Sequence, residues 1–113
     1  MPFIQVKTNQ KISAAQAEDI KSQLGKAITA IPGKSEDWLM VGLEGDAQLW
    51  FRGTDEPAAM VTVSIYGAAS GNALSTLTSH ITGILLDALG IPTDRIYVSY
   101  SATENWGWNG TNF

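Results

Sequence analysis

Hydrophobic positions along the chain follow two spacings, that of strands and that of helices. Residues 3–8 have the composition of a strand, and residues 59–66 alternate, with Val61, Val63 and Ile65 on one face. Two longer segments have the spacing of amphipathic helices. Their predicted buried positions are Ala17, Ile20, Leu24, Ala27, Ile28 and Ile31 in the first helix and Leu74, Leu77, Ile81, Ile84, Leu85, Ala88 and Leu89 in the second.

Capping and helix-breaking residues mark the ends of both helices. Ser13 is a candidate N-cap of the first helix, and Pro32-Gly33 ends that helix. Gly90-Ile91-Pro92 ends the second helix, and a strand is predicted at residues 95–100. Strand, helix and strand therefore follow one another twice, with an offset of roughly 58 residues.

This repeat predicts the fold class. We expect an α/β two-layer sandwich in which a duplicated β-α-β unit places two helices on a four-stranded mixed sheet. The length of 113 residues suits a single domain over residues 1–113.

The segment between the helices also predicts self-association. Residues 38–43 and 48–52 are expected to form a hairpin around Glu44-Gly45-Asp46. The runs Trp38–Val41 and Leu49–Phe51 are almost continuously apolar, which is typical of strands buried on both faces. Two helices cover only one face, so we expect a second copy of the chain to cover the other and predict a homo-oligomer.

Composition narrows the possible chemistry. A net charge of −4 argues against nucleic acid as a partner, and there is no cysteine for a thiolate, a disulfide or a zinc site. The only histidine, His80, falls on the polar side of the second helix and is expected to be exposed. No apolar run is long enough to span a membrane, and no signal peptide is recognisable. We expect a cytoplasmic protein, with export by a route that needs no signal peptide left open.

Pro2 is the most suggestive single residue. If Met1 is removed, Pro2 becomes a chain-terminal secondary amine at the start of a strand. Terminal amines titrate at about 7.7–8.0, and burial lowers that value toward the range useful for a general base. If Met1 is retained, the Pro2 nitrogen is an amide and cannot act as a base.

Several short motifs occur in order along the whole chain. They are Met-Pro-x-Ile at the start, Thr8-Asn9, Gly33-Lys34, Gly53-Thr54-Asp55-Glu56-Pro57, Asp94-Arg95-Ile96-Tyr97 and the tail Gly107-Trp108-Asn109-Gly110-Thr111-Asn112-Phe113. In this order, the chain resembles the macrophage migration inhibitory factor family of the tautomerase superfamily. The resemblance implies a ring-shaped homotrimer with sites between subunits. It also implies keto–enol interconversion of aromatic α-keto acids such as phenylpyruvate, without cofactor or metal.

The resemblance also implies a role for particular residues. Pro2 is expected to be the catalytic base and Lys34 to hold the substrate carboxylate. Substrate binding is expected to involve Tyr66, Trp38, Trp108 and, from the neighbouring subunit, Tyr97. Tyr66 falls where the family has an isoleucine that contributes its backbone, and the Cys-x-x-Cys of some members is here Ala58–Val61. Two further departures concern the pocket: Ser99 replaces an asparagine that contacts substrate, and Trp106 replaces a smaller aliphatic residue at the pocket mouth.

Simpler interpretations of these residues remain open at this stage. Lys34 could be a cation at a helix C-terminus, Tyr97 a half-buried strand residue, and the tryptophans core or interface residues. Two functions from different classes are likewise open: a tautomerase, and a cytokine-like protein that binds a cell-surface receptor and has weak or vestigial activity. Turnover of phenylpyruvate, set against receptor binding, distinguishes them. A third, a non-catalytic oligomeric scaffold, is favoured only if Met1 is retained.

Overall fold

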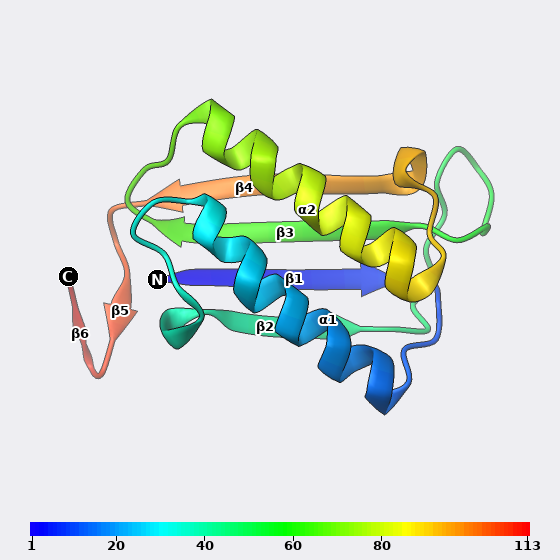
Figure 1. Cartoon of the computed structure of the whole chain (residues 1–113), viewed down its shortest axis with the longest axis horizontal. Helices are drawn as coiled ribbons and strands as arrows, with labels where there is room; N and C mark the ends of the chain where they lie inside the picture. The colour runs from blue at the N-terminus through cyan, green and yellow to red at the C-terminus, as the bar shows by residue number, and fades with distance from the viewer.

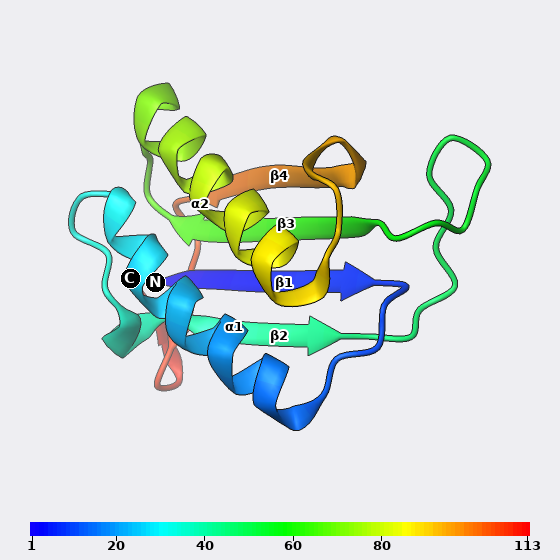
Figure 2. The same cartoon turned by 45° about the vertical axis from the view of Figure 1, so that its right-hand side comes forward.

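The computed structural model describes the whole chain, Met1–Phe113, as two helices packed on one face of a sheet (Figure 1). The elements in chain order are β1 (Pro2–Thr8), α1 (Ala14–Ala27), the 3-10 turns η1 (Ile28–Ala30) and η2 (Glu36–Trp38), β2 (Met40–Glu44), β3 (Ala59–Tyr66), α2 (Gly71–Leu89), η3 (Thr93–Arg95), β4 (Ile96–Thr103), β5 (Gly107–Trp108) and β6 (Thr111–Asn112). In the turned view of Figure 2 both helices again lie over the same face of the sheet.

The sheet confirms the predicted duplication. Its strand order is β2-β1-β3-β4. β1 is parallel to β2 and β3 is parallel to β4, so each β-α-β unit forms one parallel pair. The two units meet where β1 runs antiparallel to β3, with Ile4 opposite Val63. The sheet is therefore mixed, as expected.

The core lies between the sheet and the helices. One cluster of 17 buried hydrophobic residues joins both layers. The two helices supply Ile20, Leu24, Ala27, Leu77, Ile81, Ile84 and Leu85, all buried, and the turn after α1 adds the predicted positions Ile28 and Ile31. The predicted positions Ala17, Leu74, Ala88 and Leu89 are half-buried. Neither helix combines the length and the apolar character needed to cross a bilayer.

The predicted signals at Ser13 and Gly90 lie at helix ends, whereas α1 ends at Ala27 and the turn η1 follows it, before the predicted stop at Pro32-Gly33. Ser13 caps α1 in a reciprocal capping box: its hydroxyl accepts from the Gln16 N–H at 3.1 Å, and its own N–H donates to the Gln16 side chain at 2.9 Å. Gly90 ends α2 in the left-handed conformation, at φ 68°.

The predicted hairpin is wrong. Residues 48–52 form no strand, and Phe51 makes only an isolated bridge to Thr54. Trp38 lies in the turn η2 rather than in a strand, and β2 begins at Met40. The apolar run 49–51 belongs to a loop whose backbone carbonyls accept hydrogen bonds from distant side chains, which the local pattern does not reveal.

The premise behind the predicted homo-oligomer also needs correction. The uncovered face of the sheet is largely polar, because β1, β3 and β4 direct Gln5, Thr62, Ser64, Ser99 and Ser101 to that side. Apolar side chains lie at its margins instead. Met40 on β2 and Tyr97 on β4 are 67% and 61% exposed.

Candidate active site

The start of β1 lies at one end of the sheet, beside the C-terminal hairpin (Figure 1). Pro2 is buried there and is paired with Ile65 of β3. The Met1 carbonyl accepts a hydrogen bond from the Tyr66 N–H at 3.0 Å. With Met1 in place, the Pro2 nitrogen is part of a peptide bond, and the basic amine at this point is that of Met1.

The turn after α1 brings Lys34 to the same point. Gly33 takes the left-handed conformation at φ 83°, which favours glycine, and redirects the chain. The half-buried Lys34 then donates from Nζ to the Tyr66 carbonyl at 2.9 Å. Tyr66 therefore contacts both the start of the chain and the lysine, through its backbone N–H and C=O.

The residues around the start of β1 lower the basicity of the chain-terminal amine. Burial, first, and the charge and hydrogen bonding of Lys34, second, hold the pKa of the Met1 amino group below that of an ordinary chain-terminal amine. Both effects disfavour the ammonium form. An amine held at this end of β1 is accordingly more available as a free base near neutral pH.

Aromatic rings form a continuous wall beside the amine. Trp38 packs edge-on against Trp108, with ring centroids 5.1 Å apart. Trp108 stacks on Phe113 at 6.4 Å, and Phe113 in turn meets the Tyr66 ring at 5.2 Å. Three parts of the chain thus supply one wall: η2, the end of β3 and the C-terminal hairpin.

Two neighbouring hollows open at this wall. The first, about 330 Å³, is lined by Met1, Gly33, Trp38, Tyr66 and Phe113. The second, also about 330 Å³, includes Pro2, Trp38, Trp106 and Trp108 among its lining residues. Each falls within the range of volumes usual for small-molecule sites. The expected site residues Pro2, Lys34, Trp38, Tyr66, Trp106 and Trp108 therefore lie around one end of the sheet.

Tyr97 and Ser99 do not join them within one chain. Tyr97 pairs with Met60 on β3, which pairs with Lys7 of β1, five residues from Pro2. At strand geometry this separation is about 17 Å along β1. Ser99 lies between the two ends of the sheet, opposite Thr62, and its side chain is exposed. Within one chain, Tyr97 and Ser99 therefore lie outside the site around Pro2.

Phe113 is a lining residue that the sequence interpretation quoted in a motif but did not assign to the site. It reaches the wall because Asn109 and Gly110, at φ 53° and 83°, form a tight turn between β5 and β6. The Phe113 N–H also donates to the Trp106 carbonyl at 3.1 Å. The Asn-Gly pair is a known hairpin signal and could have indicated this turn.

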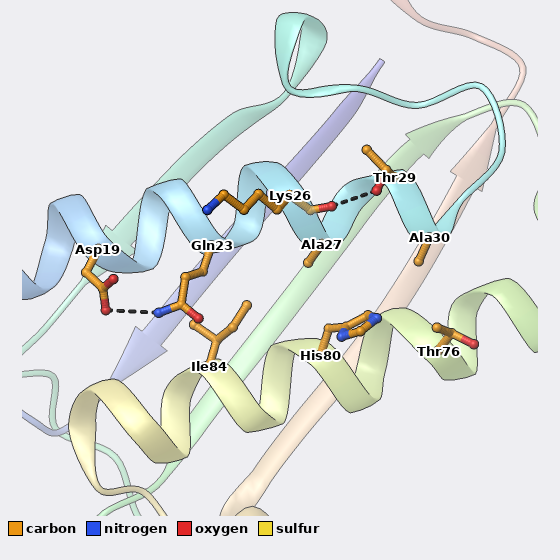
Figure 3. A pocket seen from close by; sticks show the side chains of 9 residues that line it. All are labelled: Asp19, Gln23, Lys26, Ala27, Thr29, Ala30, Thr76, His80 and Ile84. Carbon is orange, nitrogen blue, oxygen red and sulfur yellow. Dashed lines mark hydrogen bonds between the residues drawn. The ribbon is translucent and has the colours of Figure 1, made fainter.

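A larger hollow, about 640 Å³, lies between the helices and away from this site (Figure 3). Its polar groups are partly engaged with one another: Gln23 donates to the Asp19 carboxylate at 3.0 Å, and the Thr29 hydroxyl donates to the Lys26 carbonyl at 2.7 Å. His80 lines this groove and is exposed, as expected. No group of three or more His, Asp or Glu side chains that could hold a metal ion occurs in the chain.

Comparison with known proteins identifies the family. The sequence model described as macrophage migration inhibitory factor matches residues 1–113. The chain belongs to the macrophage migration inhibitory factor family. The resemblance drawn from the motifs is thereby confirmed, as is membership of the tautomerase superfamily.

Individual relatives agree with this family assignment. Macrophage migration inhibitory factor of Meriones unguiculatus is 31% identical over 115 residues, covering 100% of this chain and 99% of that protein. The Mus musculus protein of the same name is 30% identical with the same coverage. Among solved structures, Leishmania major MIF2 has a TM-score of 0.94 at 32% identity and covers 100% of this chain and 97% of that one. The expected fold class is thus confirmed for this family member.

Proposed function

We propose that this family member is a tautomerase, an isomerase that interconverts the keto and enol forms of aromatic α-keto acids such as phenylpyruvate. Pro2, freed by removal of Met1, acts as the general base. Lys34 binds the substrate carboxylate. The reaction needs no cofactor, since it moves one proton and changes no oxidation state.

The chemistry follows from the groups at the start of β1. The unprotonated Pro2 amine takes a proton from C3 of the keto acid, and the C–H electron pair forms the C2–C3 double bond while the carbonyl oxygen gains charge. Returning that proton to the oxygen gives the enol and restores the free amine. Nearby positive charge stabilises the developing oxyanion, which is usually a large part of such catalysis.

The observation that carries the proposal is the position of the chain-terminal amine, which is partly buried in a hollow beside Lys34, where its pKa is lowered. A partly buried amine next to an ammonium group is unfavourable for stability alone, because each cation opposes the other. Perturbed basic groups in a hollow are typical of functional sites. The same two effects would act on the Pro2 amine after Met1 is removed.

Lys34 and the aromatic wall favour an anionic aromatic substrate. The Lys34 ammonium has three donors, of which one is engaged by the Tyr66 carbonyl. A second donor interacts with the chain-terminal amine, and the third is free to bind a carboxylate. Trp38, Trp108 and Phe113 present ring faces and edges suited to a phenyl group.

A homotrimer is part of the proposal, because Tyr97 and Ser99 lie too far from Pro2 to act within one chain. In a ring of three subunits, we infer that these residues reach the neighbouring site. Ser99, shorter than asparagine, and Trp106, bulkier than an aliphatic residue, would then shape which keto acids are accepted.

The decisive experiment combines mass and turnover. We expect the active protein to lack the mass of Met1 and to tautomerise phenylpyruvate. Pro2→Gly, which keeps a terminal primary amine, should retain some activity, and acetylation of the amine should abolish it. Full activity in protein whose intact mass still includes Met1 would overturn the role of Pro2.

A second candidate function is receptor binding with vestigial catalysis. The curated relatives of similar length carry the name macrophage migration inhibitory factor, which favours testing it. Binding of the purified chain to a cell-surface receptor, unchanged by Pro2→Gly and accompanied by negligible turnover of aromatic keto acids, would favour this alternative.

A further inference from the structure

The loop between β2 and β3 is held by two side chains from distant parts of the chain. Asn9 donates from its amide to the carbonyls of Leu49, Asp55 and Glu56, at 2.9–3.2 Å, and accepts from the Ala58 N–H at 3.0 Å. Asn9, which follows β1 directly, therefore binds this loop at two places, at Leu49 and at residues 55–58.

Arg95, just before β4, fastens the same loop from the other side. Its guanidinium donates to the carbonyls of Pro57, Phe51, Thr54 and Glu56, at 2.8–3.2 Å. Arg95 is buried, and its four bonds lie at partly buried positions, where they are less exposed to competing water than on the open surface. The loop consequently has one well-defined conformation although it contains no regular strand.

This arrangement fixes the ring of Phe51. Phe51 and Thr54 exchange two backbone hydrogen bonds, of 2.9 and 3.1 Å, across a turn in which Arg52 and Gly53 have φ 53° and 77°. The Arg95 guanidinium lies 5.2 Å from the Phe51 ring centroid, a cation–π distance. Arg52 lies at 5.4 Å from the same centroid.

Tyr97 depends on this ring for its own packing. Tyr97 projects from β4, which is an edge strand, and is 61% exposed. The Phe51 ring meets it edge-on, with centroids 5.1 Å apart and planes at 81°. An exposed side chain on an edge strand samples several rotamers, and ordering it upon binding costs free energy.

We propose that Phe51 and Arg95 are positioning residues for Tyr97, holding its ring ready for the neighbouring subunit's site; this rests on the proposed tautomerase function and its trimer. Arg95 orders the loop, the loop orders Phe51, and Phe51 restricts Tyr97. Neither Phe51 nor Arg95 needs to contact substrate.

Phe51→Leu tests the proposal, because leucine keeps an apolar side chain but removes the ring. We expect the KM for phenylpyruvate to rise about 2- to 12-fold, the range of an aromatic pair, with a smaller change in kcat. Phe51→Tyr keeps the ring and should restore the KM. Trp50→Leu is the matched control: Trp50 is the adjacent loop aromatic, makes no ring pair, and should change the KM by less than about twofold.

A double-mutant cycle separates positioning from general stability. In a Tyr97→Ala background, Phe51→Leu should change the KM by less than about twofold, because the residue through which it acts is gone. If the two substitutions instead raised the KM independently, so that the KM of the double variant were the product of the two single changes, the proposal would be overturned. An unchanged KM in Phe51→Leu would also overturn it.

Proton NMR of Tyr97 provides a readout independent of activity. The readout that matters is the Tyr97 side-chain rotamer, measured from its Hα–Hβ scalar couplings, because loss of the Phe51 ring current alone moves chemical shifts. The couplings should approach rotamer-averaged values in Phe51→Leu and keep wild-type values in Trp50→Leu, whereas unchanged couplings in Phe51→Leu would overturn the proposal. If the wild-type protein turned over no aromatic keto acid, the proposed function would fail, and the NMR comparison alone would decide whether Phe51 positions Tyr97.

Discussion

Lys34 has two roles at the start of β1 that can be measured separately. Its Nζ donates to the Tyr66 carbonyl at 2.9 Å, and its charge helps to lower the pKa of the adjacent terminal amine. A helix C-terminal cation would need neither contact. The residue therefore differs from Lys26, which is the basic residue in the last turn of α1.

Lys34→Ala should weaken substrate binding and raise the pKa of the catalytic amine. The KM for phenylpyruvate should rise more than kcat falls, by about 1–3 kcal/mol of binding free energy, the size of a charge-assisted hydrogen bond. Activity requires the free amine and so increases as pH rises through its pKa. Without the nearby ammonium, that inflection should move to higher pH.

The measurement is a pH profile of kcat/KM for the variant and for Lys26→Ala. The Lys26 variant should keep both the KM and the inflection of the wild type, since Lys26 is exposed on the helix. Identical profiles for the two variants would mean that Lys34 is only a helix-end cation.

At the scale of elements, α1 begins at an N-cap, Ser13, that the sequence predicts. The Ser13 hydroxyl and the Gln16 side chain satisfy each other's backbone N–H groups at the start of the helix. Gln16 also donates to the Ala88 carbonyl at 3.2 Å and so links the start of α1 to the end of α2.

Ser13→Ala should lower the free energy of unfolding by about 1 kcal/mol, the usual value of an N-cap hydroxyl. Chemical denaturation followed by circular dichroism measures this loss. Ser75→Ala, an exposed position within α2, is the control and should change stability by less than about 0.5 kcal/mol. Equal losses in both variants would contradict a specific role for the cap.

The second prediction at this scale concerns the local stability of the loop between β2 and β3. Asn9→Ala removes the bonds to Leu49, Asp55, Glu56 and Ala58 and should permit local opening without global unfolding. Trypsin should then cut after the exposed Arg52 about tenfold faster, which corresponds to roughly 1.4 kcal/mol of local stability. Gln48→Ala, in the same loop, should be cut at the wild-type rate; faster cutting there would show that any change in the loop suffices.

For the whole molecule, apolar side chains at the margins of the open sheet face support assembly better than the face itself. Met40 on the edge strand β2 and Tyr97 on the edge strand β4 are mostly exposed, while the centre of the face is polar. Scattered exposed apolar residues are common, so assembly has to be measured.

We predict a sedimenting mass three times that of the 12.1 kDa chain at micromolar concentration. Met40→Glu should shift the equilibrium toward smaller species, because assembly would bury an unpaired charge. Lys26→Glu, on the helix layer, should leave the mass unchanged. A folded wild-type monomer at this concentration would refute the trimer.

Local pattern was sufficient to predict much of this protein. The 3.6-residue spacing located both helix stripes, Ser13 and Gly90 marked helix ends, and the repeated strand–helix–strand order implied the mixed sheet. These features depend on neighbouring residues in sequence, which is why sequence reveals them. The motifs around Pro2 and Lys34 likewise indicated which end of the sheet to examine.

Long-range contacts determined what the pattern predicted wrongly or missed. Residues 48–52 look like a strand, but their carbonyls bond to Asn9 and Arg95, some 40 positions away, instead of to a neighbouring strand. The aromatic wall forms only where three separated segments meet. The distance between Tyr97 and Pro2 follows from the register of the strands, which the sequence does not show. The spacing of hydrophobic residues indicates which face of a helix or strand a side chain lies on. The hydrogen-bond partner of a backbone carbonyl depends instead on the tertiary structure of the whole chain.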